Sequence, residues 1–270
     1  MISAIVLTKN EENDLPSCLN ALRWCDDLHV VDSGSTDKTV SIAREQGAKV
    51  YISSFISFAQ QRNWALENCD LKHEWVLFLD ADEHSTDTFL ACLKYEIQKA
   101  TSDVAGFYCC GKTILKKRWL KKSDNFPKWQ YRLMRQGRSK FIDVGHGQKE
   151  GVIEGTIGYI KEPYLHFAFS HGFDAWTAKH IGYAVRDAKA IYDSPLAIRF
   201  LYSRHGSRRN TAYKNLCRRM PGWPLIRFIY SFIFLGGFTE GQEGLFYCRK
   251  MFWYERQVRS QLKLLAKIHR

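Results

Sequence analysis

The sequence predicts an α/β fold, with a mostly parallel central sheet followed by a helical region. Over the first hundred residues, short apolar runs typical of buried strands alternate with stretches of helical periodicity. From Gly172 onward the patterns are helical. Strands separated by helices of this length form right-handed βαβ units, in which the strands run parallel. We therefore expect a main domain over residues 1–170 and a helical appendage over residues 171–270.

Four strands and three helices are expected in the first hundred residues. The strands are expected at residues 2–7, 28–31, 49–52 and 74–79, and the helices at residues 14–24, 35–46 and 58–68. The first helix places Leu15, Leu19 and Leu22 on one face, as an amphipathic helix requires. The second helix has capping residues at its start and Gly47 at its end.

The expected elements downstream are less regular. Strands are expected at residues 104–110 and 129–134, and antiparallel or irregular structure over the glycine-rich residues 145–158. The remaining chain predicts helices at residues 175–192, 208–219, 225–235 and from Gly241 onward.

The chain is strongly basic. Its 270 residues include 40 Lys and Arg against 28 Asp and Glu, which gives a net charge of +12. Such a balance suits an anionic partner, whether nucleic acid, an acidic membrane surface or a phosphorylated substrate. From Ser194 to Thr239 there are basic residues but no acidic ones.

The cysteines and the amino terminus favour a cytoplasmic setting. The eight cysteines are scattered without a C-x-x-C pair, which gives no zinc signature and suits a reduced compartment. The chain begins directly with a strand pattern and shows no signal peptide. Its longest apolar stretch, residues 228–238, is too short to span a bilayer.

Polar side chains follow three of the expected strands, in segments Thr8–Glu12, Asp32–Ser35 and Asp80–Glu83. The loops at the carboxyl ends of parallel strands open on one edge of the sheet, where open α/β sheets bind ligands. Asp80 and Asp82 could hold a divalent cation against a diphosphate, because Mg²⁺ is usually bound by one or two carboxylates and substrate phosphates. Asp32 could accept a hydrogen bond from a base or a ribose.

Each of these loops also has a plainer interpretation as a helix-capping turn, with Asp82 or Ser85 as the cap of the next helix. The sequence contains neither G-x-G-x-x-G nor G-x-x-x-x-G-K-[ST]. A dinucleotide-binding fold and a P-loop are therefore disfavoured.

Four segments, in this order and spacing, resemble a family 2 glycosyltransferase with the nucleotide-sugar-binding GT-A fold. They are Thr8–Glu12, Val31–Thr39, Gln61–Leu66 and Phe78–Glu83. More narrowly, the chain resembles the bacterial branch that contains lipopolysaccharide-core β-glucosyltransferases and exopolysaccharide glycosyltransferases. Later segments match this branch as well: Arg132–Arg135, Gly145–Glu150, Pro163–His166 and Gly237–Gly241.

The resemblance implies an inverting, metal-dependent enzyme that moves a sugar from a nucleotide-sugar donor, expected to be a UDP-sugar. The implied acceptor is a lipopolysaccharide-core, exopolysaccharide or other lipid-linked glycan. The implied nucleotide-sugar site consists of the loop that borders the nucleotide, the acid that reads the base, a basic residue near the diphosphate and the first acid of the Asp-x-Asp pair. In this sequence these are Thr8, Asn10, Glu11, Asp32, Arg62 and Asp80.

The resemblance also implies a metal site for Mg²⁺ or Mn²⁺. Asp80 and Asp82 match the Asp-x-Asp pair, with Asp82 as the direct ligand. His166 could complete the site, as a distant histidine does in some GT-A enzymes.

An inverting enzyme needs a carboxylate base that deprotonates the acceptor hydroxyl. The resemblance favours Glu150, which lies in the branch's His-Glu region, and the alternatives are Asp143 and Glu154. Many relatives have the histidine and the glutamate adjacent, whereas three residues separate His146 from Glu150 here. Glu240 stands where the branch more usually has an aspartate, and the resemblance implies no role for it.

The carboxyl-terminal third mixes arginines with aromatic side chains. For an enzyme with a lipid-linked acceptor, this composition favours an anionic membrane surface over nucleic acid, for which no binding signature appears. Many of the aromatic residues would alternatively pack the appendage against the sheet domain. We expect the chain to be peripheral on the inner face of the cytoplasmic membrane, and the sequence predicts no oligomeric state.

Two other functional classes fit less well. A nucleotidyltransferase would have a glycine-rich, basic loop directly after the first strand, and Thr8–Glu12 contains no glycine. A non-enzymatic protein that binds membranes or nucleic acid would leave the three polar loops unexplained.

Overall fold

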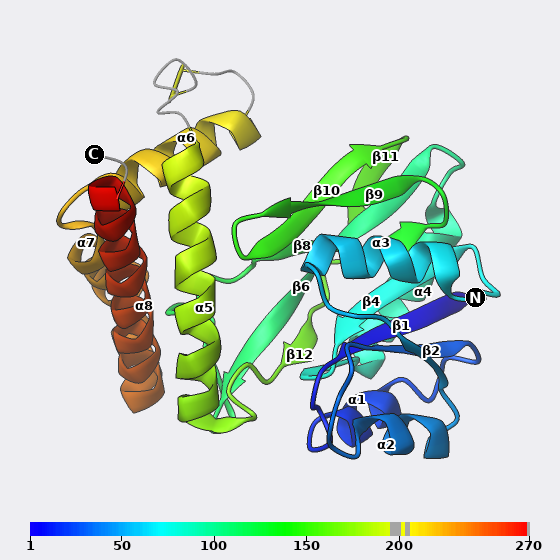
Figure 1. The fold of residues 1–270 in the computed structure, drawn as a ribbon. Helices are drawn as coiled ribbons and strands as arrows, with labels where there is room; N and C mark the ends of the chain where they lie inside the picture. Colours follow the sequence, from blue (N-terminus) through cyan, green and yellow to red (C-terminus); the bar gives the residue numbers. More distant parts are fainter. Residues whose placement is uncertain (195–200, 203–205, 269–270) are drawn as a thin grey trace. The chain divides into compact units, whose positions relative to one another are not determined.

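The computed structural model describes residues 1–194, 201–202 and 206–268 (Figure 1). The chain divides into two compact units. The first, the sheet unit, is formed by Met1–Trp119, Phe126–Asp143 and Gly147–His171. The second, the helical unit, is formed by Leu120–Asn125, Val144–His146 and Gly172–Arg270.

The sheet unit is built on a mixed sheet of ten strands. Eight follow one another in the order β3 (Lys49–Ile52), β2 (Leu28–Asp32), β1 (Ile2–Thr8), β4 (Trp75–Asp80), β8 (Trp129–Arg135), β6 (Val104–Leu115), β12 (Tyr164–His166) and β5 (Glu83–His84). The other two, β7 (Arg118–Trp119) and β11 (Thr156–Tyr159), pair with β6. The first four strands are parallel, as the sequence predicts, whereas β8 runs antiparallel to both its neighbours.

Helices cover both faces of this sheet. Along β4, Trp75, Leu77 and Leu79 belong to one buried cluster, and the alternate residues Val76 and Phe78 belong to another. The first cluster is completed by α1 (Leu15–Ala21), α2 (Thr39–Glu45) and α4 (Asp87–Lys99). The second is completed by α3 (Phe58–Asn68) and by β9 (Ser139–Val144), which forms a separate hairpin with β10 (Gly147–Ile153). A strand buried on both faces explains the unbroken apolar run before Asp80.

Most of the expected elements are present, and some differ in extent. The strand at residues 49–52 and the helix at residues 58–68 have the predicted bounds. Helix α1 ends at Ala21, earlier than expected. The cap of α4 is Thr86, whose hydroxyl accepts the Phe89 N–H at 3.1 Å, so the suggestion that Asp82 or Ser85 caps this helix is wrong.

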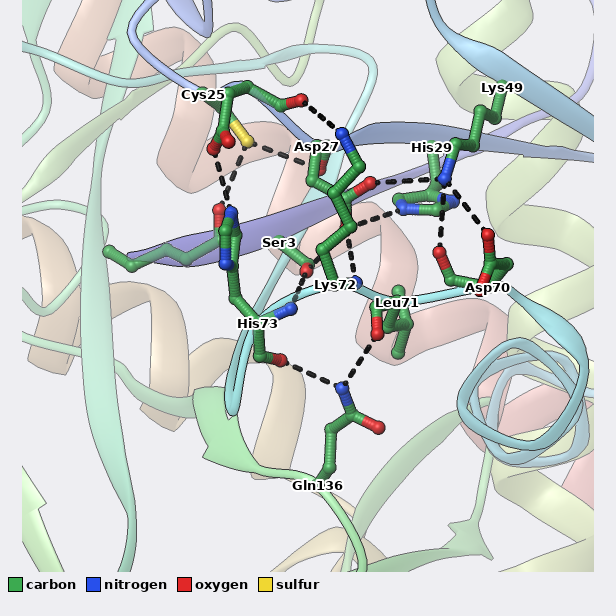
Figure 2. A network of polar contacts seen from close by, with 12 residues as sticks. Ser3, Cys25, Asp27, His29, Lys49, Asp70, Leu71, Lys72, His73 and Gln136 are labelled. Atoms are coloured by element: carbon green, nitrogen blue, oxygen red, sulfur yellow. Dashed lines mark hydrogen bonds and ion pairs between the residues drawn. The ribbon is translucent and has the colours of Figure 1, made fainter.

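A buried polar network holds the amino-terminal edge of the sheet together (Figure 2). The Asp27 carboxylate accepts hydrogen bonds from the Ser3 hydroxyl at 2.6 Å and the Lys72 N–H at 2.8 Å, and it contacts His29 at 2.9 Å. Burial alone would raise the pKa of Asp27, but these partners outweigh it and hold the pKa well below its usual range. These bonds tie β1, β2 and the segment before β4 together, at the edge opposite the polar loops.

The helical unit contains α5 (Gly172–Asp193), α6 (Gly206–Arg219), α7 (Trp223–Ile229) and α8 (Gly241–Ile268). Between α7 and α8 lie a π-helical turn, η2 (Tyr230–Phe234), and a 3₁₀ turn, η3 (Gly237–Glu240). The helix expected at residues 225–235 is therefore an α-helix that continues as a π-helical turn. Helices α5 and α8 pack side by side, with the Trp176 and Trp253 rings 6.1 Å apart (Figure 1).

Candidate functional site

The three polar loops meet at the carboxyl edge of the parallel strands. The last residues of β1 and β2 pair directly, Thr8 with Asp32, and Leu7 of β1 pairs with Asp80 of β4. The register therefore brings together the segments that the sequence placed at separate strand ends.

Asp32 is fully buried and organises the first two loops. One of its carboxylate oxygens accepts the hydroxyls of Thr8 at 3.0 Å and Ser35 at 2.5 Å. The other accepts the N–H groups of Gly34 at 2.8 Å and Ser35 at 2.7 Å. Four donors occupy the four acceptor positions of a carboxylate. In this structure Asp32 shapes the loop, and a base could bind to it only by displacing one of these donors.

The loop after β1 is fastened to the loop after β2 by several further bonds. Asn10 has a positive φ of 55°, donates its N–H to the Ser35 hydroxyl at 2.7 Å and accepts the Thr36 N–H at 2.8 Å. The Glu11 N–H donates to the Thr39 hydroxyl at 2.7 Å. These hydrogen bonds connect the predicted donor-binding residues of the two loops, of which Thr8 and Asp32 are buried and Asn10 and Glu11 are accessible.

Asp80 is held between two buried arginines. Arg62 Nη2 donates to one carboxylate oxygen and Arg132 Nη2 to the other, both at 3.0 Å. Arg62 comes from α3 and lies within 6 Å of the Phe78 and Phe141 rings. Burial lowers the pKa of Arg62, and Asp80 opposes this effect. Arg62 is only 1% exposed, so its observed role is to fix Asp80.

Glu83, which is itself buried, completes this charge cluster. Its carboxylate contacts Arg132 Nη2 at 2.6 Å and accepts the Asp80 N–H at 2.9 Å, which closes the turn. Burial raises the pKa of the Glu83 carboxyl, with Arg132 acting in the opposite direction. Two arginines and two carboxylates thereby compensate one another beneath the turn.

Asp82 has a different position from Asp80. Its carboxylate lies 3.5 Å from His166 Nε2, and both side chains are partly exposed. They meet because β12 pairs with β5, with His166 opposite Glu83, and because the Phe167 N–H donates to the Asp82 carbonyl at 2.8 Å. The structure thus brings together the two residues that the sequence placed 84 positions apart as metal-ligand candidates.

A further cluster of possible metal ligands, which sequence reasoning missed, is formed by Glu11, Asp14 and His171. His171 Nε2 lies 2.8 Å from Glu11 and 3.0 Å from Asp14, and the ligand atoms of these three residues lie within 4.8 Å of one another. Burial would lower the pKa of His171, but the two carboxylates outweigh it and raise the pKa. The pair Glu11–His171 spans 160 residues, and no local motif marks it.

The three candidates for the base have different surroundings. Glu150 on β10 is half-buried and accepts the Tyr108 hydroxyl at 2.5 Å. Asp143 is exposed and accepts the Ala59 N–H, in the first turn of α3, at 3.3 Å. Glu154 is bonded through its N–H to the Arg138 carbonyl. His146, which precedes Glu150, is hydrogen-bonded to Asp187 at 2.8 Å.

The donor set of the acidic turn fits a divalent cation. A carboxylate and an imidazole, both accessible, are ligands that Mn²⁺ and related ions accept, and phosphate oxygens of a substrate commonly complete such sites. Asp80, with each oxygen bound to a buried arginine, is better placed to hold the turn than to supply a free ligand.

Comparison with known proteins identifies the family. Residues 3–149 match the model of glycosyl transferase family 2. An uncharacterized glycosyltransferase of Rickettsia bellii is 42% identical over 83 residues, which are 30% of this chain and 28% of the relative. The lipopolysaccharide core biosynthesis glycosyltransferase LpsC of Rhizobium meliloti is 28% identical over 173 residues, 62% of this chain and 63% of LpsC. The alignments thus cover less than two thirds of these relatives.

Solved structures show more distant similarity. TarS (residues 1–349) of S. aureus is 16% identical with a TM-score of 0.44, over 98% of this chain and 91% of that one. Glucosyl-3-phosphoglycerate synthase of Mycobacterium tuberculosis, in complex with Mg²⁺ and UDP, is 21% identical with a TM-score of 0.36, over 42% and 44% of the two chains.

The family match covers more than half of the chain and includes all three polar loops. The sheet unit has the GT-A fold of that family, with its mixed α/β sheet. The chain belongs to glycosyl transferase family 2.

Proposed function

We propose that this glycosyltransferase is inverting and metal-dependent, and that it transfers a sugar from a UDP-sugar to a lipopolysaccharide-core, exopolysaccharide or other lipid-linked glycan. The observation that carries the proposal is the acidic turn at the carboxyl edge of the sheet, where Asp82 faces His166 while Asp80 is locked by Arg62 and Arg132. The similarity to LpsC supports the class of acceptor.

In this proposal, Asp82 and His166 would hold Mg²⁺ or Mn²⁺, and the cation would neutralise the diphosphate as it leaves. Asp80 fixes the turn that carries Asp82. Arg62 and Arg132 act from beneath, by keeping Asp80 charged and oriented. Arg62 thus serves the diphosphate region through Asp80.

The donor's nucleotide would lie along the first two loops. We place it against Asn10 and Glu11, with Thr8 and Asp32 buried behind them, because the hydrogen bonds of these residues fix the two loops before any ligand arrives. Such preorganisation reduces the entropy that binding would otherwise cost. Asp32 would either support these loops or exchange one of its four donors for the base.

Glu150 is our choice for the base. It would take the proton of the acceptor hydroxyl as that oxygen attacks the anomeric carbon, opposite the leaving diphosphate. Its bond to Tyr108 orients the carboxylate. The Glu154 N–H bonds to Arg138, which follows the last residue of β8. That end of β8 pairs with Trp75, the first residue of β4. Glu154 therefore lies near the edge of the sheet opposite the polar loops. Asp143 is engaged with the start of α3.

A thermal-shift panel tests the donor and the metal together. We expect a UDP-sugar with Mn²⁺ or Mg²⁺ to raise the melting temperature, and GDP-, ADP- and dTDP-sugars to raise it less. A ligand at a hundred times its Kd stabilises a protein by about 2.7 kcal/mol. The shift should vanish with EDTA and in Asp82→Asn. An equal shift without metal would refute the metal assignment.

Glu150→Gln tests the base. We expect turnover to fall by about 10²–10⁴-fold, as removal of a general base typically does, while the metal-dependent shift with donor is retained. Tyr108→Phe should lower turnover less and leave the Michaelis constant for the donor unchanged. Retained activity in Glu150→Gln would move the base to Asp143, and Asp143→Asn is the matching variant.

A lipid-linked acceptor lies in a membrane. We therefore also propose that the protein associates peripherally with the inner face of the cytoplasmic membrane.

A further inference from the structure

One face of the segment formed by α7 and η2 is apolar and exposed. Its six residues follow helical spacing and are 37% (Ile229) to 76% (Phe234) exposed. They are Leu225, Ile226, Ile229, Tyr230, Ile233 and Phe234. We call them the α7–η2 face. A surface helix of a soluble protein normally carries polar side chains at such positions.

The opposite side of the same segment packs on α8. Pro224 is buried, Phe228 lies 6.1 Å from Phe252 of α8, and Phe232 stacks on Phe228 at 5.5 Å. Arg227 forms an ion pair with Glu255 of α8. Phe228 and Phe232 are half-buried and pack on α8 and on each other within the helical unit, so neither belongs to the α7–η2 face.

The arginines of this region have structural partners. Arg218 bonds to Asp187 at 3.0 Å and to Glu255 at 3.1 Å. Arg219 donates to the carbonyls of Ile191 and Ser194. The side chain of Arg208 lies outside the described residues. For Arg218 and Arg219, the sequence-based expectation of a surface role is not supported, because both serve to join helices.

The charge of the chain is nevertheless concentrated in this part. Residues 172–270 contain 18 Lys and Arg against 6 Asp and Glu, whereas residues 1–171 contain 22 of each. Three of those six acids, Asp187, Glu240 and Glu255, are buried. Exposed cations of the helical unit include Lys121, Lys122, Arg209, Arg249 and Arg256.

We propose that the α7–η2 face inserts into the surface of an anionic lipid bilayer and serves as an interfacial anchor. No helix in the described part of the chain has the length and apolar character needed to cross a bilayer. An apolar face on a unit that also carries exposed basic groups suits a position in the plane of the headgroups. A second copy of the chain is a poorer occupant, because pairing two such surfaces would bring like charges together.

This inference rests on the proposed function only in one respect: a lipid-linked acceptor explains why the enzyme would need a membrane surface. Binding to the bilayer itself requires neither donor nor metal. The two proposals can therefore fail independently.

The test is co-sedimentation of the full chain with vesicles of phosphatidylcholine containing about one third phosphatidylglycerol, in about 0.1 M salt. The variant is I229Q/I233Q, which removes two aliphatic side chains four residues apart without changing the charge. We expect its partition coefficient to fall by about tenfold or more. The matched control is L264Q/I268Q, the same change at exposed positions of α8, for which we expect no comparable loss.

Melting temperature and the metal-dependent shift with UDP-sugar should be unchanged in I229Q/I233Q. Equal vesicle binding by wild type and I229Q/I233Q would overturn the proposal, as would an equal loss in L264Q/I268Q. Sedimentation velocity tests whether a second copy of the chain covers this face. If I229Q/I233Q converts a dimer into a monomer and still binds vesicles, the α7–η2 face is a dimer interface and not an anchor.

Discussion

The two aspartates of the acidic turn have different partners. Asp80 points toward two buried guanidinium groups, and Asp82 lies beside His166 with both side chains partly exposed. The Asp80 side chain is the more exposed of the two, 39% against 22%, so their partners and not their accessibility distinguish them. An aspartate that neutralises buried arginines contributes to stability, whereas one beside an imidazole can join it in binding a metal. The two residues should therefore respond differently to the same substitution.

Asp80→Asn should destabilise the fold and Asp82→Asn should not. Without the Asp80 charge, Arg62 loses its only carboxylate partner in the described structure, and we expect the free energy of unfolding to fall by about 1–3 kcal/mol. Asp82→Asn should remain within about 0.5 kcal/mol of wild type in metal-free buffer. Urea denaturation monitored by tryptophan fluorescence measures both. Equal stability of the two variants would contradict this division.

The sequence could place Asp80, Asp82 and Asp32 at the carboxyl edge of the sheet, because each ends or follows an apolar run. It could not predict their partners. Arg132 lies 52 residues from Asp80, and His171 lies 160 residues from Glu11. Such pairs depend on the register of the whole sheet, which no local pattern encodes.

At the scale of elements, prediction worked where a single segment carries its own signals. Helix α3 and strand β3 have the predicted bounds because periodicity and capping define them locally. Strands β5 and β12 have two and three residues and exist only through pairing with each other and with β6. The π-helical turn η2 continues α7 and contacts α8, and apolar periodicity alone does not distinguish it from an α-helix.

Glu240, for which the sequence implied no role, joins η3 to the segment Leu120–Asn125 within the helical unit. Its carboxylate accepts the N–H groups of Lys122 at 2.5 Å and Ser123 at 3.0 Å. Glu240→Ala would leave these groups without that acceptor, and we expect a loss of about 1–3 kcal/mol in unfolding free energy. Glu240→Gln, which keeps one side-chain oxygen, should lose less. Equal losses in chemical denaturation would argue against the hydrogen bonds as the cause.

Helix α5 contains a histidine that should make stability depend on pH. Burial lowers the pKa of His180 to about 4, and its ring stacks on Trp176 at 3.6 Å. The unfolded chain, with an ordinary histidine pKa near 6.5, binds a proton first as the pH falls. His180 therefore contributes stability that is complete above pH 6.5 and is lost as the pH falls toward about 4.

His180→Phe should remove this contribution. Between about pH 6.5 and 4, the decline of unfolding free energy should become shallower by up to about 1.4 kcal/mol per pH unit, the slope for one proton. Denaturation midpoints of wild type and His180→Phe across this range provide the measurement. Parallel profiles would show that His180 is not the titrating group.

At the scale of the whole molecule, charge and chemistry are divided along the chain. The polar loops lie in a part with balanced charge, and residues 172–270 carry the entire net charge of +12. The sequence correctly indicated a basic carboxyl-terminal region. It could not show which side chains face outward. Composition alone suggests exposed arginines and buried apolar residues, whereas Arg218 bonds to the buried Asp187 and apolar residues of α7 are exposed.

This arrangement predicts two contributions to membrane binding with different salt dependence. Raising the salt from about 0.1 M to about 1 M shortens the Debye length from about 10 Å to about 3 Å and weakens the attraction of headgroups for exposed cations. The insertion of apolar side chains does not weaken with it. We expect wild-type binding to the same vesicles to fall severalfold but remain measurable, and I229Q/I233Q to bind only at low salt. If wild type and variant become indistinguishable at high salt, the association is electrostatic alone and the α7–η2 face does not enter the bilayer.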